Sequence, residues 1–265
     1  MLLECSNLSK SYGNVKALQN VSFSLADGLS LILGPNGSGK TTFLKILSKI
    51  IEPDDGSIVL RGMKYKEYPP HKVGFSFEKT IMLPRVKVRD YLEAVAEYRG
   101  LDNVDDVVDM FGLREYQGAR FKELSQGYKR RFLVAAAFVG KPDVVFLDEP
   151  FSNLDVISKV ELSRTFQEIK GEVSIVIVSH IISGLRNLDS LVLLHNGRVV
   201  VNRVGDKAKT VGGFRAVFQD GSVVEDDVGE LMKWIREGKE LARIEPITPE
   251  DVIYETLRGK ERRLQ

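Results

Sequence analysis

The sequence predicts an α/β fold in which a parallel sheet is wound with helices. Short, largely apolar runs alternate with segments of helical periodicity, and a glycine-rich loop stands between one such run and a helix-like stretch. The composition, 43% hydrophobic and 28% charged, is that of an ordinary soluble globular protein. The 265 residues are enough for one domain of about 200 residues and a small appendage.

Eight short runs are expected to be strands: 2–8, 17–25, 29–33, 57–61, 73–77, 144–147, 173–178 and 191–194. The later runs are largely apolar, as strands of a sheet buried on both faces require. A helix is expected at 40–50, directly after the glycine-rich loop. Segment 88–138 is expected to be mostly helical, because Tyr91, Val95 and Tyr98 recur at helical spacing, and to form a subdomain of its own.

The residues after Gly205 predict a small ordered appendage, 206–265, with the element order ββαβα. Runs 216–219 and 222–225 flank Asp220-Gly221, a pair typical of a two-residue hairpin turn in which both residues have positive φ. A helix from Asp227, a strand at 241–244 and a last helix from Thr248 are expected to follow. The apolar face of the first helix would consist of Val228, Leu231, Met232 and Ile235.

Charge and cysteine content exclude several classes of protein. Lys plus Arg number 38 against 37 Asp plus Glu, so a net charge of +1 gives no global electrostatic case for nucleic acid or an anionic membrane. The single cysteine, Cys5, cannot form an intrachain disulfide or a zinc cluster, which fits a reducing cytosol. The longest apolar run, 132–139, is far shorter than the roughly 20 residues of a membrane-spanning helix. We therefore expect a soluble chain that would rely on another chain to cross any membrane.

The sequence GPNGSGKTT, between the expected strand 29–33 and helix 40–50, matches a phosphate-binding loop. Its residues are Gly34, Pro35, Asn36, Gly37, Ser38, Gly39, Lys40, Thr41 and Thr42. The glycines let backbone N–H groups approach phosphate oxygens, and the helix that follows adds its dipole. Lys40 would place its charge between the β- and γ-phosphates, and the Thr41 hydroxyl would ligate Mg²⁺.

Two acids follow the apolar run 144–147, at the carboxyl end of a strand, where ligands sit on open α/β sheets. Asp148 is placed to hold Mg²⁺ through water. Glu149 is placed to orient and deprotonate the water that attacks the γ-phosphate. By itself an apolar strand that ends in two acids is a weak signal, but the upstream phosphate loop favours a nucleotide site.

With these motifs, residues 2–205 resemble the ATP-binding cassette family. Leu124-Ser125-Gln126-Gly127-Tyr128 stands where that family has its LSGGQ signature, and Ser152-Asn153-Leu154-Asp155 matches its D-loop. His180 matches the switch histidine, and Tyr12 matches the aromatic residue that stacks on adenine. The resemblance implies that Ser125 and Gly127 contact ATP held by a second copy of the chain, so that two ATP molecules lie between two subunits.

The resemblance also implies a phosphate-loop core with an antiparallel β-subdomain and a helical subdomain at about 85–140, all within 1–205. ATP and Mg²⁺ would be the cofactors. Glu149 and His180 would be the catalytic residues, and Thr41, Asp148 and Glu78 would form the metal site. From its residue type and position, Ser125 is also expected to cap the helix that contains 132–139.

Two features depart from the family pattern. Gln126 and Tyr128 replace a glycine and a glutamine of the signature, while Ser125 and Gly127 remain. Glu78 replaces the glutamine that senses Mg²⁺ and the attacking water. A carboxylate there can still approach Mg²⁺, but it adds negative charge near Glu149. The alternative for Glu78 is a plain exposed loop acid.

The resemblance further implies a cytoplasmic, stand-alone ATPase subunit that drives an integral membrane permease from the inner face of the cell membrane. Family members receive the permease's coupling helices in the region of 88–120, beside the Glu78 loop. The ending 247–253 resembles the closing helix of exporter-type ATPases, which favours export over the alternative of an importer's ATPase.

A soluble cassette ATPase that acts on ribosomes or DNA is the alternative from another class. The single cassette and the lack of a heptad tract count against it. The basic cluster Lys129-Arg130-Arg131 is expected to be a solvated helix face, and no nucleic-acid partner is expected.

Overall fold

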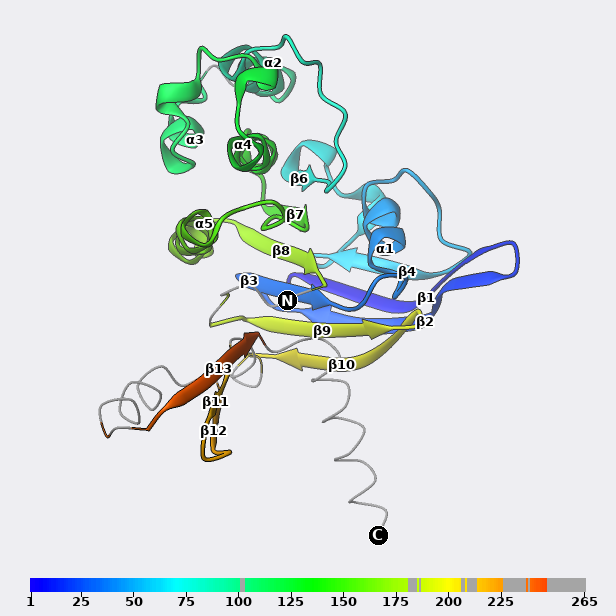
Figure 1. Ribbon diagram of the computed structural model, residues 1–265. Helices are drawn as coiled ribbons and strands as arrows, with labels where there is room; N and C mark the ends of the chain where they lie inside the picture. Colours follow the sequence, from blue (N-terminus) through cyan, green and yellow to red (C-terminus); the bar gives the residue numbers. More distant parts are fainter. Residues whose placement is uncertain are drawn as a thin grey trace.

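The computed structural model describes residues 1–100, 103–180, 185, 187–205, 208, 214–225, 237 and 239–246 (Figure 1). The strands of this described part form a six-stranded, a four-stranded and a three-stranded sheet. The helices expected from Asp227 and Thr248, and the ending 247–253, lie outside the described residues.

The six-stranded sheet is the predicted parallel sheet. Its strands, in spatial order, are β10 (Arg198–Val204), β9 (Ser190–His195), β3 (Leu29–Leu33), β8 (Ser174–Ser179), β7 (Val144–Asp148) and β6 (Val73–Ser76). All neighbours pair in parallel except β10, which is antiparallel to β9. Alternate residues of one strand belong to different cores, Leu31 to one and Ile32 to the other. The uninterrupted apolar runs therefore reflect burial on both faces of this sheet.

The first strands form a separate antiparallel sheet, as the fold class predicted. Its strands, in spatial order, are β2 (Val15–Leu25), β1 (Leu3–Tyr12), β4 (Asp55–Leu60) and β5 (Met63–Lys64). Helix α1 (Lys40–Leu47) contributes Phe43, Leu44 and Leu47 to the core that this sheet shares with one face of the six-stranded sheet. The rings of Phe23 and Phe43 meet edge to face, with their centroids 5.2 Å apart. Burial of α1 between the two sheets positions the loop that precedes it.

Helices cover the other face of the six-stranded sheet, in the upper part of Figure 1. They are α2 (Val88–Tyr98), α3 (Asp105–Met110), α4 (Gln126–Phe138) and α5 (Val156–Ile169). Helix α4 packs closely on β6, because a Cβ at Gly74 would lie 2.1 Å from the carbonyl oxygen of Ala137. None of the helices in the described part of the chain is long and apolar enough to cross a membrane.

One expected helix is shorter than predicted. Helix α1 ends at Leu47 instead of residue 50, because Lys49 takes a left-handed conformation with φ 59°. Segment 88–138 is mostly helical, as predicted, and Gly100 and Gly112, at φ 75° and 61°, follow the ends of α2 and α3. Short 3₁₀ turns also occur in the described residues, at η1 (Tyr65–Glu67), η2 (Pro70–Lys72), η3 (Arg114–Tyr116) and η4 (Phe121–Glu123).

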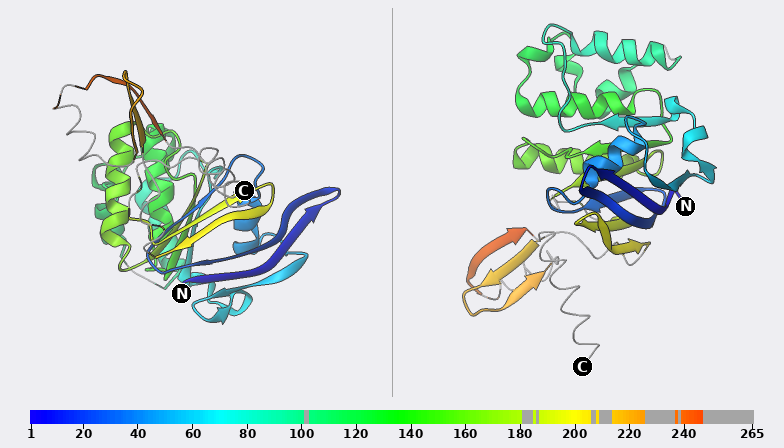
Figure 2. Two further views of the ribbon diagram at one scale, coloured as in Figure 1. Left: turned by 90° about the horizontal axis from the view of Figure 1, so that it is seen from below. Right: turned by 90° about the vertical axis from the view of Figure 1, so that its right-hand side faces the viewer.

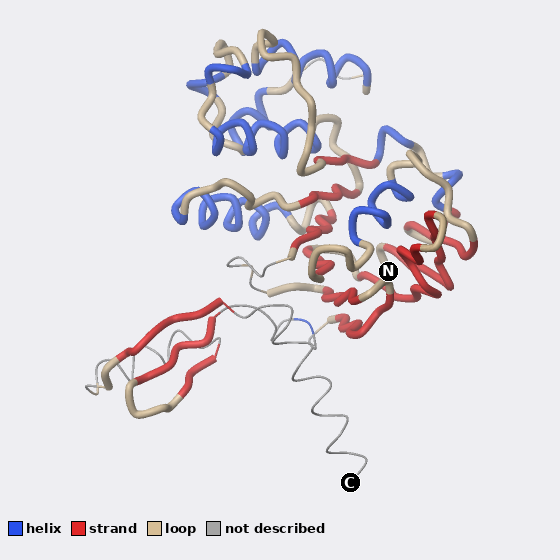
Figure 3. Tube along the Cα trace, turned by 45° about the vertical axis from the view of Figure 1, so that its right-hand side comes forward, coloured by secondary structure: helices blue, strands red, loops and turns tan. Residues whose placement is uncertain are grey.

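Beyond residue 205 the described strands β11 (Phe214–Phe218), β12 (Val223–Glu225) and β13 (Leu241–Pro246) form their own antiparallel sheet (Figures 2 and 3). The predicted hairpin exists, but its loop has three residues instead of two. The Phe218 N–H donates to the Ser222 carbonyl at 2.9 Å, and the Gly221 N–H donates to the Phe218 carbonyl at 3.0 Å. Positive φ occurs at Gly221, at 80°, and not at Asp220. A tight turn followed by a left-handed glycine closes the loop.

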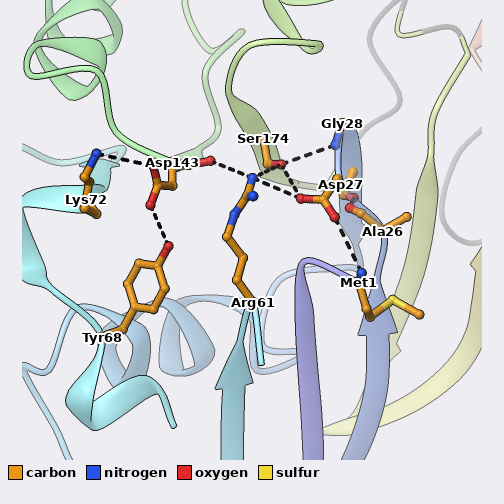
Figure 4. A network of polar contacts seen from close by, with 10 residues as sticks. Met1, Ala26, Asp27, Gly28, Arg61, Tyr68, Lys72, Asp143 and Ser174 are labelled. Atoms are coloured by element: carbon orange, nitrogen blue, oxygen red, sulfur yellow. Dashed lines mark hydrogen bonds and ion pairs between the residues drawn. The ribbon is translucent and has the colours of Figure 1, made fainter. Parts of the chain in front are cut away.

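A polar network joins the two larger sheets at the amino-terminal ends of β7 and β8 (Figure 4). The Tyr68 hydroxyl donates to the Asp143 carboxylate at 2.7 Å, and Lys72 approaches the same carboxylate at 3.5 Å. Arg61, in the turn after β4, approaches Asp27 at 3.0 Å. Burial, and next the hydrogen bond to Asp143, raises the pKa of Tyr68 to about 12. This network lies at the opposite ends of the strands from the predicted site residues and thus has a structural role.

Cys5 offers a test of the fold. It lies in β1 between β2 and β4, is 3% exposed, and burial raises its pKa to about 12. Because the thiolate is the reactive form and pH 8 is well below that pKa, we expect the native protein to react with Ellman's reagent much more slowly than a free thiol. Guanidinium-unfolded protein, the control, should react rapidly with one thiol per chain. Rapid stoichiometric reaction of the native protein would contradict this placement of β1.

Candidate functional site

Four neighbouring parallel strands end at one edge of the six-stranded sheet, and predicted site residues follow each of them. Strand β3 continues into the loop 34–39, and β8 continues into His180. Strand β7 ends at Asp148 and is followed by Glu149, and β6 leads to Glu78. The order β3-β8-β7-β6 therefore lines up the phosphate loop, the histidine and the three acids along one edge.

Glycine is required by the shape of the loop 34–39. A Cβ at Gly34 would lie 2.3 Å from the Leu194 carbonyl oxygen, and one at Gly39 would lie 2.5 Å from the Ala17 carbonyl oxygen. Gly39 also has a φ of 105°. The Gly34 N–H donates to the Ser179 carbonyl oxygen at 3.2 Å. The loop is thus packed too tightly against its neighbours for side chains at these positions. Because glycine has no side chain, a ligand at the sheet edge can approach the loop backbone closely.

Lys40, the first residue of α1, lies inside this loop. Its Nζ donates to the carbonyl oxygens of Gly34 at 2.5 Å and Pro35 at 3.0 Å, and the residue is 7% exposed. Helix α1 begins without a side-chain cap, and the Ser38 Oγ is buried without a hydrogen-bond partner in the described part of the chain. A buried ammonium group beside an uncapped helix N-terminus is suited to an anion such as a phosphate.

The other loop residues are more accessible. Asn36, Gly37 and Thr41 are exposed, and Pro35 and Thr42 are partly buried. The exposed Thr41, next to Lys40, can therefore reach a ligand from solvent. Tyr12, 46% exposed, lies at the end of β1 in the hairpin whose other strand contacts Gly39 through Leu18. Its ring is free to be covered by a flat ligand, which stays a prediction.

Glu149 and His180 form a direct pair. Glu149 Oε1 accepts from the His180 backbone N–H at 2.8 Å and lies 2.7 Å from His180 Nδ1, while Oε2 accepts from the Ser179 hydroxyl at 2.7 Å. Because a carboxylate only accepts, Nδ1 carries the hydrogen in this pair. Glu149 has a φ of 48°, an unusual conformation for a residue with a side chain, and is 8% exposed. A strained backbone and three donors hold this carboxylate in one place.

Asp148 is a second buried carboxylate beside Glu149, 7% exposed. Burial, and next the charge of Glu149, raises the pKa of Asp148 to about 6, although the backbone N–H of Glu78 donates to this carboxylate and acts in the opposite direction. The side chain of Glu78 is exposed, and its charge also raises the pKa of Asp148. A cation bound here would reduce the repulsion between these acids.

The donor set suits Mg²⁺ held together with a ligand's phosphates. Within the described residues no three His, Cys, Asp or Glu side chains gather as a metal cage. Mg²⁺ usually keeps several waters and binds one or two protein oxygens plus phosphate oxygens. The exposed Thr41 hydroxyl and the Asp148 carboxylate are groups of that kind. Thr41 and Asp148 would hold the ion, and the exposed Glu78 could approach it.

The signature residues form the start of α4. Ser125 is the N-cap, its Oγ accepting from the Tyr128 N–H at 3.3 Å, which confirms the predicted cap. Ser125 and Gln126 are exposed, and Gly127 faces Leu154 of the D-loop, 3.6 Å from where a Cβ would be. Asp155 caps α5 through the Ser158 N–H at 2.8 Å. The exposed end of α4 presents backbone N–H groups to solvent, where another molecule can reach them.

The replacement of the signature glutamine by Tyr128 has a local explanation. Its ring packs against that of Tyr116 at a tilt of 34°, with centroids 3.9 Å apart, and the Arg131 guanidinium lies over it at 5.4 Å. A hydrogen bond with Tyr116, and next partial burial, raises the pKa of Tyr128. This tyrosine therefore packs within the helical part. Nothing in the structure explains why Gln126 replaces glycine.

The expected solvated face at Lys129-Arg130-Arg131 is wrong for Arg130. This residue is 5% exposed and donates to the carbonyl oxygens of Phe77, at 2.9 Å, and Asp148. Arg131 forms an ion pair with Glu161 at 2.6 Å, and Lys129 lies over the Phe121 ring. The three basic residues of α4 thus have three different environments.

Arg130 and Ser179 are the site residues that the sequence interpretation missed. Arg130 could have been found, because it continues the buried stripe of α4 through Val134 and Ala137 at helical spacing. Ser179 gave a weaker signal, a hydroxyl at the end of an apolar strand directly before His180.

Comparisons with known proteins show which family the chain is similar to. A family profile described as ABC transporter matches residues 18–152. The lantibiotic transport ATP-binding protein SrtF of Streptococcus pyogenes is 28% identical over 215 residues, which cover 79% of this chain and 94% of the relative. The molybdate/tungstate import ATP-binding protein WtpC of Pyrococcus horikoshii is 33% identical over 217 residues, 77% of this chain and 62% of the relative.

A solved structure described as the ATP binding subunit of an ABC transporter has the same fold. It matches with a TM-score of 0.69 and 26% identity and covers 77% of this chain and 90% of that chain.

Proposed function

Since this chain belongs to the ABC transporter family, whose ATP-binding proteins are ATPases, we propose that it hydrolyses ATP as a dimer and drives a separate membrane permease. The observation that carries the proposal is the sheet edge where the phosphate loop, Asp148, Glu149 and His180 meet. The assembly would sit on the inner face of the cell membrane through the permease.

Each group at this edge has a distinct part in hydrolysis. Lys40 would release its two loop carbonyls and bind the β- and γ-phosphates, and Tyr12 would cover the adenine ring. Mg²⁺, when bound near Thr41 and Asp148, would offset the negative charge of the phosphates. Glu149 would accept the proton of the attacking water, as the acid that is not committed to the metal.

His180 would act as a switch for Glu149. In this structure its ring occupies Glu149 Oε1, yet the side chain is 47% exposed and has room to rotate. Rotation toward the γ-phosphate would remove Nδ1 from Oε1 and let the water approach this oxygen, while the Ser179 hydroxyl on Oε2 and the His180 backbone N–H on Oε1 still hold the carboxylate. Hydrolysis would therefore begin only when a nucleotide recruits His180.

A second copy of the chain would complete the site. The exposed N-terminus of α4, with Ser125 at its cap, offers donors suited to a phosphate. Lys40 and the N-terminus of α1 would already bind the phosphates of the nucleotide on this chain. We therefore assign Ser125 and Gly127 to ATP on the partner subunit, and Asp155 to the facing D-loop.

A groove on the helical part is suited to the permease. It has a volume of about 400 Å³ and is lined by aromatic and aliphatic side chains that include Phe77, Tyr91 and Tyr98. Tyr98 of this lining is 86% exposed, and Ile81 and Leu83, in the loop that follows the lining residue Thr80, are 102% and 70% exposed. Exposed apolar side chains beside a groove are typical of a docking site for an apolar or amphipathic segment.

Export is the favoured direction. This chain spans nearly the whole of the lantibiotic transport protein SrtF but less than two thirds of the importer protein WtpC. The importer relative therefore has a large additional part that this alignment leaves out.

We propose that residues 206–265 form a small separate appendage, because their described strands pair only with one another in the described part of the chain.

Replacement of Glu149 by Gln should lower ATP turnover by about 10²–10⁴-fold, because the amide cannot accept the proton of the attacking water. ATP binding should persist, since a charge that repels the γ-phosphate is removed. Phosphate release and equilibrium binding of a fluorescent ATP analogue measure the two effects. Glu172→Gln, which removes an exposed acid elsewhere, is the control and should behave as the native protein. Undiminished turnover by Glu149→Gln would place the general base elsewhere.

Replacement of Ser125 by Arg should prevent ATP-dependent dimerisation, because the bulky side chain would fill the space for the partner's phosphate. Binding of ATP by the monomer should be unchanged. Light scattering in the Glu149→Gln background, where ATP persists, measures the dimer directly. Ser57→Arg, an exposed serine of β4, is the matched control. Equal dimerisation of the two variants would remove the assignment of Ser125 to the interface.

Replacement of Tyr98 by Asp should abolish co-purification with a six-helix membrane protein encoded beside this gene, because a charge would enter the groove. ATPase activity of the isolated chain should be unchanged. The matched control is Val160→Asp on α5, also an exposed apolar residue at 63%. Absence of such a neighbouring gene, or of co-purification by the native chain, would favour the soluble cassette ATPase.

A further inference from the structure

Arg130 is a buried cation that the mechanism above does not use. It is 5% exposed and lies in α4, five residues after Ser125. Burial lowers the pKa of Arg130 to about 10, while the charges of Asp148, Glu78 and Glu149 raise it. The guanidinium is therefore charged at neutral pH, and a buried charge is costly unless its surroundings compensate for it.

The guanidinium bridges two loops of the site. Its Nη1 donates to the Phe77 carbonyl oxygen at 2.9 Å, and its Nη2 donates to the Asp148 carbonyl oxygen. The last paired residues of β6 and β7 are Ser76 and Leu147, so both carbonyls belong to the residues directly beyond the ladder. Where the strands stop pairing with each other, one planar side chain links them.

The surroundings of Arg130 hold three carboxylates. Asp148 and Glu149 are buried, and Glu78, which stands where the family resemblance expects a neutral glutamine, adds a third negative charge. Glu78 is also tied to Asp148 through its backbone N–H. Without a nearby cation these acids would repel one another.

We propose that Arg130 is a positioning residue, whose guanidinium holds the Phe77–Glu78 and Asp148–Glu149 turns together and offsets the charge that Glu78 adds. Because Ser125 caps the same rigid helix, about 7.5 Å away along its axis, movement of α4 would reach both turns through Arg130. The kinetic part of this inference rests on the proposed function, whereas its structural part does not.

The test uses variants of the full chain. Arg130→Met removes the charge and both hydrogen bonds at similar length, and Arg130→Lys keeps the charge but cannot span both carbonyls with a planar fork. Glu78→Gln removes the added acid, alone and together with Arg130→Met. Lys129→Met, which removes a positive charge from the adjacent, partly exposed residue of α4, is the control.

The first readout is hydrogen exchange without nucleotide. We expect Arg130→Met and Arg130→Lys to exchange faster than the native protein in peptides that cover 76–80 and 148–152, because the turns lose a shared anchor. Lys129→Met should match the native protein. Exchange that is unchanged in both Arg130 variants would overturn the proposal, whether or not the chain hydrolyses ATP.

The second readout separates kcat from KM. We expect Arg130→Met to lower kcat by roughly 10- to 100-fold, as misplacement of a catalytic group does, with a much smaller change in the KM for ATP. Glu78→Gln should partly restore both kcat and the melting temperature in the Arg130→Met background, although it cannot restore the hydrogen bonds. An effect of Arg130→Met that is the same with and without Glu78→Gln would refute the charge compensation.

The experiment distinguishes a failure of the proposed function from a failure of the role proposed for Arg130. If the native chain has no ATPase activity, the proposed function fails, while hydrogen exchange and melting temperatures still decide the role of Arg130. If Arg130→Met does not fold, Glu78→Gln must restore a cooperative unfolding transition to it. Failure of that rescue, with native exchange in Arg130→Lys, would overturn the proposal.

Discussion

Parallel pairing of β3, β8, β7 and β6 is the constraint on which the rest of the structure depends. Because parallel strands end at the same edge, it brings together loops that are distant along the chain. The pairing also requires apolar side chains on both faces, and the two cores that meet this sheet supply them. The nucleotide site is thus a consequence of sheet topology, and each of its loops starts from a rigid strand end.

Concentrated negative charge is what this edge has to accommodate. Asp148 and Glu149 are buried side by side, and the raised pKa of Asp148 expresses the cost. Several groups reduce that cost: the donors around Glu149, the Glu78 N–H and the Arg130 guanidinium. Two further contacts occupy groups of the site, a lysine bound to its own loop and a histidine bound to the proposed general base. These are the contacts that ATP would exchange for its own.

The surfaces that we propose for partners lie on the helical part. The N-terminus of α4 is exposed at Ser125, and the lining of the aromatic groove includes Phe77, one residue before Glu78. Helix α4 also bears Arg130, which contacts both acid-bearing turns. One helix therefore connects the proposed interface with a second copy, the groove and the proposed catalytic edge, which is a physical route by which ATP binding would move the proposed permease.

The sequence by itself determined the parallel sheet, the phosphate loop and the two acids after β7, because apolar runs and short motifs are local patterns that burial and ligand chemistry constrain directly. It also determined that Ser125 caps α4, since capping depends on adjacent residues. Only the tertiary structure decided that Arg130 is buried. A run of basic residues predicts a solvated surface, and the packing of α4 on the sheet is what buries one of them. The early end of α1 and the three-residue hairpin loop were likewise decided by left-handed residues at Lys49 and Gly221. The contact of Ser179 and His180 with Glu149 joins two strands far apart in the chain, and no local pattern encodes it.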